Sequence, residues 1–119
     1  MAIFDTLHTD RLTCPWCGYD GEMTIQVRQE ILPDAWQNDW NIGDTVTSLE
    51  GSITFDDEAF CPRCYARYEV AHLKAYDEGR VWDNEEIARQ QAAGDCPTEW
   101  TTPVRVTIKD GVLVSITTI

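Results

Sequence analysis

The chain has 119 residues, 43% of them apolar, and carries 21 acidic side chains against 9 basic ones, which gives a formal net charge of −12. This length suits one compact domain, and five tryptophans argue against a disordered chain. No run of roughly 18 apolar residues is present, so we expect no membrane-spanning helix. Asp5 interrupts the N-terminal apolar residues where a signal peptide needs an unbroken run, so we expect a soluble, cytoplasmic protein.

Alternating apolar residues predict strands in the first half of the chain. Residues 22–32 place apolar side chains at every second position, and Pro33 ends this pattern. Residues 34–45 form a polar connection, and residues 52–60 are again typical of a strand. This part of the chain therefore predicts an inserted sheet segment over about 22–60.

The stretch 65–76 fits either a strand or a helix, because its apolar residues allow both periods. We expect a strand, since residues 77–79 have the composition of a turn and residues 80–82 resemble a returning strand.

One short helix is predicted at about 84–93. Asp83 or Asn84 can accept hydrogen bonds from the free N–H groups at its start, and two glutamates follow that favour the positive end of the helix dipole. Gly94 is typical of a helix end.

The C-terminal residues, about 103–119, predict a β-hairpin. Asp110-Gly111 lies between two alternating apolar runs, which is a strong signal for a two-residue turn. The predicted inward face consists of Val104, Val106, Ile108, Val112, Val114 and Ile116. We therefore expect residues 1–119 to form one mainly β (α+β) domain, zinc-ribbon-like and antiparallel, with one short helix.

Two C-x-x-C pairs, Cys14/Cys17 and Cys61/Cys64, are the most specific feature of the sequence. Each spacing lets a tight turn aim two sulfurs at one point, and four thiolates saturate a tetrahedral cation. Pro follows the first cysteine of each pair and fixes φ, while Gly18 permits a positive φ after the first pair. The sequence thus predicts one four-cysteine metal site that holds Zn²⁺.

Other readings of the cysteines are weaker. Disulfides need an oxidising compartment, which disagrees with the expected cytoplasmic location. A redox C-P-x-C motif needs a helix that starts at the motif, but Gly-Tyr-Asp-Gly follows Cys17 and would break such a helix. Iron is the alternative metal, because CPWCGYDG resembles the first knuckle of rubredoxin, although Tyr65 replaces the glycine of the second knuckle. Cys96 has no partner at C-x-x-C spacing, and we expect it to be an apolar filler.

The start Met1, Phe4, Asp5 and Thr6, followed by the C-P-x-C-G knuckle, the Gly-Asp-Thr-Val turn and the second C-x-x-C, resembles small, largely uncharacterised zinc-ribbon proteins of bacteria and their phages. The resemblance covers roughly residues 1–70. It implies zinc and a β-rich ribbon, located in the host-cell cytoplasm if the protein is phage-encoded, and it implies no activity.

The sequence favours an interaction protein over an enzyme. A closed four-thiolate site leaves no position for substrate, and no nucleophile motif or phosphate-binding loop is present. The acidic charge disfavours direct nucleic-acid binding, for which a ribbon would use Arg63 and Arg67. We expect a larger protein partner, bound by aromatic and acidic residues. The candidates are Trp36, Trp40, Glu78, Asp83, Glu85 and Glu86.

Overall fold

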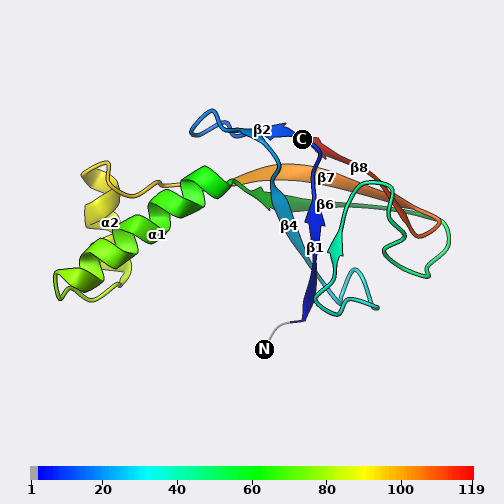
Figure 1. The fold of residues 1–119 in the computed structure, drawn as a ribbon, viewed down its shortest axis with the longest axis horizontal. Coiled ribbons are helices and arrows are strands. Elements are labelled where there is room, and N and C mark those ends of the chain that lie inside the picture. Colours follow the sequence, from blue (N-terminus) through cyan, green and yellow to red (C-terminus); the bar gives the residue numbers. More distant parts are fainter. Residues whose placement is uncertain (1–2) are drawn as a thin grey trace.

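The computed structural model describes residues 3–119 and contains a six-stranded sheet, a two-stranded ribbon and two helices (Figure 1). The sheet has the order β5-β1-β4-β6-β7-β8, and β2 pairs with β3. The strands are β1 (Phe4–His8), β2 (Leu12–Thr13), β3 (Asp20–Gly21), β4 (Thr24–Arg28), β5 (Asp39–Trp40), β6 (Ser52–Phe60), β7 (Thr101–Lys109) and β8 (Val112–Thr118). The helices are α1 (Pro62–Asp77) and α2 (Asn84–Ala92). The mainly β, α+β prediction is confirmed, with two helices instead of one.

The predicted C-terminal hairpin is present as β7 and β8. Asp110 and Gly111 both have positive φ, 49° and 82°, as the two-residue turn requires. A β-carbon at Gly111 would collide with the Thr47 carbonyl oxygen, so this position needs glycine for space as well.

The predicted inward face of β8 is wrong at two positions. The two-residue turn pairs Lys109 with Val112 and Ile108 with Leu113, and a bulge beyond these pairs lets Val106 pair with Ile116. The turn therefore places Leu113 on the core side and leaves Val112 only partly buried and Val114 exposed, and the bulge returns Ile116 to the core side.

A buried carboxylate organises the other end of the sheet. Asp5 on β1 is 0% exposed and accepts hydrogen bonds from the backbone N–H groups of Trp36 and Asn38, both at 2.9 Å. Its second oxygen accepts from the Trp40 indole at 2.8 Å. Three donors offset the cost of burying the charge, and they hold the connection beside β1, where β5 pairs parallel to it.

The strand predictions for residues 65–76 and 80–82 are wrong. Residues 62–77 form α1, which begins with Cys61 as its N-cap and Pro62 in its first turn, and residues 80–82 form no strand. The sequence of this stretch fits a strand as well as a helix because its apolar residues do not lie on one side of α1. The helix buries Ala71 and Ala75 on one side and leaves other apolar side chains exposed on the opposite side. Neither helix is long and apolar enough to cross a membrane.

The predicted helix at 84–93 is confirmed as α2. Asp83 is its N-cap, accepting from the Glu86 N–H at 2.9 Å, and Gly94 follows the helix with a φ of 80°. The two helices form an arm that projects from the sheet (Figure 1).

Aromatic contacts fasten this arm to the start of β7. The Tyr68 ring lies 4.6 Å from the Trp100 ring and 5.6 Å from the Trp82 ring, between centroids. The Trp82 indole donates to the Tyr68 hydroxyl at 3.1 Å, and His72 stacks on Trp82 at 4.9 Å. The chain leaves the sheet at the end of β6 and returns to it at the start of β7, where Phe60 and Thr101 pair.

Replacing Asp5 by Asn is predicted to destabilise the protein by about 2–3 kcal/mol, because the amide group would face a buried N–H donor and the charge-assisted hydrogen bonds would be lost. Urea unfolding at fixed free metal concentration measures this. Asp56→Asn is the matched control, since it removes only an exposed ion pair with Arg105 and should cost less than about 1 kcal/mol. Equal effects would contradict the role assigned to Asp5.

His8 predicts a pH-dependent contribution to stability. Hydrogen bonds to Asp39 and to Glu22 raise the pKa of His8 above its ordinary 6.5. A pKa that is higher in the folded state means that the stabilisation is complete below pH 6.5 and is lost as the pH rises through the raised pKa. The difference in melting temperature between the wild type and His8→Gln should therefore shrink from about pH 6 to about pH 9. A difference that stays constant would contradict this.

Candidate metal centre

The first cysteine pair lies in the turn between β2 and β3. The Cys14 N–H donates to the Tyr19 carbonyl at 2.7 Å, and the Gly18 N–H donates to the Cys14 carbonyl at 3.0 Å. Gly18 has the positive φ, 76°, that the sequence predicted. These bonds close the turn, so that the thiols of Cys14 and Cys17 approach the same point.

The second pair lies where β6 ends and α1 begins. The Cys61 side chain accepts from the Cys64 N–H at 3.5 Å, and the Tyr65 N–H donates to the Cys61 carbonyl at 3.0 Å. Both cysteines therefore sit at the positive end of the α1 dipole, which favours thiolates. Cysteine followed by Pro62 is a helix-start signal that could have revealed α1 in the sequence.

The four sulfurs lie close enough together to hold one metal ion, all within 4.8 Å of one another. The Cys14 and Cys64 sulfurs are 3.8 Å apart, and those of Cys17 and Cys61 are 3.5 Å apart. A tetrahedral ion with metal–sulfur bonds of about 2.3 Å requires sulfurs about 3.8 Å apart. Three of these cysteines are buried and Cys17 is partly buried.

The protonation chemistry of the cluster favours a cation at its centre. Burial opposes ionisation of Cys17, but the Tyr19 backbone N–H and the neighbouring thiols outweigh burial and lower its pKa from 9.0 to about 7. Burial, and then the Cys17 sulfur, raise the pKa of Cys64 far above its usual range. Four thiolates this close repel one another, so a bound cation is what allows all of them to ionise.

Arg63 ties the helix to the first knuckle. Its guanidinium donates to the Cys17 carbonyl at 3.2 Å and lies 5.8 Å from the centre of the Tyr19 ring. This arginine, considered above for nucleic acid, thus supports the site directly.

Cys96 lies outside the cluster. It is 3% exposed, its thiol donates to the Pro97 carbonyl at 3.6 Å, and burial raises its pKa. These surroundings are those of a buried apolar filler.

The structure does not bring the six candidate partner residues together. Trp36 is 70% exposed and accessible to a partner, whereas Trp40 is partly buried and donates a hydrogen bond to Asp5. Glu78, Asp83 and Glu85 are exposed on the arm, where Asp83 also caps α2.

Glu86 is buried, which contradicts its place on an acidic surface. It is 8% exposed and accepts from Arg89 at 2.7 Å, from Arg80 at 2.7 Å and from Gln90 at 3.1 Å. These groups, Arg89 first, lower the pKa of Glu86 to about 2. Its position one turn after Asp83 faces it inward, towards Gln90, so it stabilises the arm and is not free for a partner.

Comparisons of this chain with protein families, with curated proteins and with solved structures gave no match.

Replacing Cys64 by Ser is predicted to abolish stable metal binding and to loosen the start of α1, because three thiolates remain and the site opens to water. Competition with a chromophoric chelator measures the metal affinity, and circular dichroism reports the helix. Cys96→Ser is the matched control and should retain one metal per chain. Loss of the metal in both variants, or in neither, would contradict the four-cysteine assignment.

Proposed function

We propose that this protein is a zinc-stapled protein-interaction module that acts as an adaptor or inhibitor of a larger protein assembly. The closed geometry of the four-cysteine cluster carries the proposal. Four thiolates saturate a tetrahedral ion, so no ligand position is left for water or substrate, and the ion acts on the fold. The metal therefore stabilises the fold, and the fold presents the surface that binds a partner protein.

Zinc is the metal that we assign. The sulfur separations suit a tetrahedral ion, and zinc prefers this geometry with thiolate ligands. The resemblance to small bacterial and phage zinc-ribbon proteins supports the same choice. A rubredoxin-like iron centre remains the alternative occupant of the same ligands, and it would make the protein an electron carrier.

The arm offers the surface best suited to a protein partner. On the side of α1 opposite the buried Ala71 and Ala75, Val70, Leu73 and Tyr76 are 64%, 61% and 75% exposed. Spacings of three residues place them on one face of the helix, and large apolar side chains grouped in this way are typical of interaction sites. Glu69 and Asp77 are exposed on the same helix, as are Arg67 and Lys74, so charges of both signs accompany the apolar residues, as in the polar rim of an interface.

Introducing two charges by Val70→Glu with Leu73→Glu is predicted to abolish partner binding while folding and metal content persist. Affinity isolation of the tagged protein from the organism that encodes it, with quantitative mass spectrometry, measures the loss. Leu49→Glu with Val114→Glu is the matched control, since both of these side chains are exposed but lie outside the arm. Equal recovery of the partner with both double variants would contradict the proposal.

A further inference from the structure

The six-stranded sheet is split between its two central strands. β1 pairs with β4 over five residues and β7 pairs with β6 over nine, but β4 and β6 share only the pair Thr24 and Phe60. Beyond this pair β4 and β6 diverge (Figure 1). Among residues 3–119, no strand pairs with residues 52–59 on this side of β6. Such an edge presents unpaired backbone N–H and C=O groups to any chain segment that enters the gap between β4 and β6.

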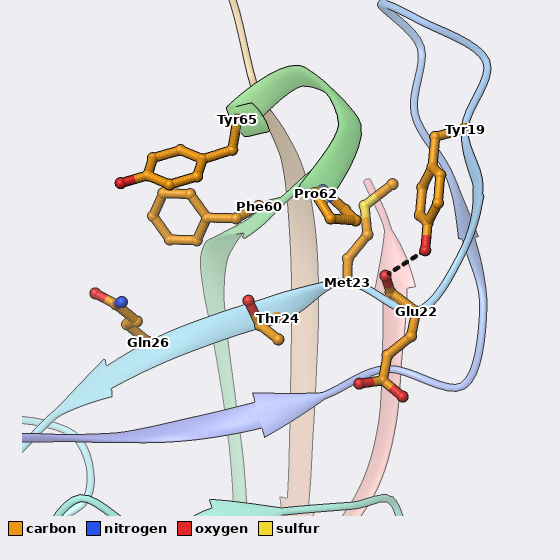
Figure 2. A pocket seen from close by; sticks show the side chains of 8 residues that line it. All are labelled: Tyr19, Glu22, Met23, Thr24, Gln26, Phe60, Pro62 and Tyr65. Carbon is orange, nitrogen blue, oxygen red and sulfur yellow. Dashed lines mark hydrogen bonds between the residues drawn. The ribbon is translucent and has the colours of Figure 1, made fainter. Parts of the chain in front are cut away.

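Two connected hollows occupy the place where the strands separate. The larger, of about 650 Å³, has aromatic walls formed by Tyr19, Phe60 and Tyr65. Figure 2 shows Phe60 and Tyr65 side by side on one side of it and Tyr19 on the other. The smaller hollow, of about 360 Å³, shares Gln26 and Phe60 with the larger one and continues along β6. Together they form a groove between β4 and β6.

The walls of this groove are acidic. Its carboxylates come from Glu22, Glu30, Asp57 and Glu58, against one cation, Arg28. Asp57 stands in line with Phe55 and Ala59 on the inward side of β6, where apolar residues are expected. It accepts from the Glu58 N–H at 2.8 Å and forms no ion pair within the described residues. Burial raises the pKa of Asp57, as expected for a carboxylate without a cation beside it.

We propose that the groove binds an extended, basic segment of a partner protein, which adds to the free edge of β6 as a strand. The strand edge supplies main-chain hydrogen bonds, Asp57 and Glu58 receive lysine or arginine side chains, and the aromatic hollow receives a further side chain. This inference rests on the proposed role as an interaction module and specifies the chemistry of one partner, at a surface that includes the first turn of α1 but not its exposed apolar residues Val70, Leu73 and Tyr76.

A peptide fits these observations better than two other occupants. Single-stranded nucleic acid could stack on the aromatic walls, but the carboxylates would repel its phosphates. A second copy of this chain carries the same charge of −12, so the electrostatic attraction that a basic peptide offers is absent.

The test is an NMR titration of the metal-loaded, ¹⁵N-labelled chain with a synthetic peptide as long as β6 in which Lys and Val alternate. We expect shifts of backbone amides in β4 and β6, and weaker or no binding by two control peptides. One control has Glu in place of Lys, and the other is N-methylated at alternate residues so that one edge cannot donate hydrogen bonds.

Asp57→Asn and Asp56→Asn form a matched pair of variants that change the net charge equally. Asp57 lines the groove, whereas Asp56 pairs with Arg105 at 2.9 Å. We expect Asp57→Asn to weaken peptide binding about fivefold and Asp56→Asn to leave it nearly unchanged.

Each of these results would overturn the proposal: no binding, equal weakening by both variants, or shifts confined to residues that do not line the groove. Concentration-dependent broadening of the β6 amides without peptide would overturn it in favour of a second copy. The arm variant Val70→Glu with Leu73→Glu separates the two proposals, since it should still bind the peptide if the groove acts independently of the exposed apolar face of α1.

Discussion

The four-sulfur cluster joins two segments that the sequence places far apart, and the positions of the other elements depend on it. Cys14 and Cys64 are 50 residues apart and their sulfurs lie 3.8 Å from each other. One side of the cluster is the turn of a two-stranded ribbon too small to be stable alone, and the other is the first turn of a helix. Metal binding at such a site supplies on the order of 10 kcal/mol to folding, which is comparable to the total stability of a small domain.

This arrangement explains how a helical arm can project from a sheet. The four-cysteine cluster joins the start of α1 to the first knuckle, and the contacts among Tyr68, Trp82 and Trp100 fix the return of the chain into β7. The paired strands β6 and β7 connect the arm to the turn at Asp110-Gly111. The arm therefore needs few contacts with the sheet, and both its outer apolar face and the groove beside β6 stay accessible.

Local chemistry in the sequence predicted the parts of the fold that depend on neighbouring residues. The C-x-x-C spacing, the Asp-Gly turn and the Asp83 cap each act within a few residues, and each is present in the structure. Features that depend on distant partners were missed. The burial of Trp40 depends on Asp5, and the burial of Glu86 depends on the fold of the arm, which brings Arg80 against α2. The inward position of Leu113, in contrast, follows from the two-residue turn itself, which pairs Ile108 with Leu113. The strand prediction for 65–76 failed because α1 has apolar residues on two sides, which blurs the helical period.

Native mass spectrometry of the freshly purified chain, before and after chelation, tests the central claim most directly. We expect one zinc ion per chain, and we expect that removing the ion shifts the protein to the high charge states of an unfolded chain. Iron in place of zinc would contradict the assigned metal and favour an electron carrier. A chain without metal, or one that stays compact after chelation, would contradict the role of the cluster as the staple of the fold.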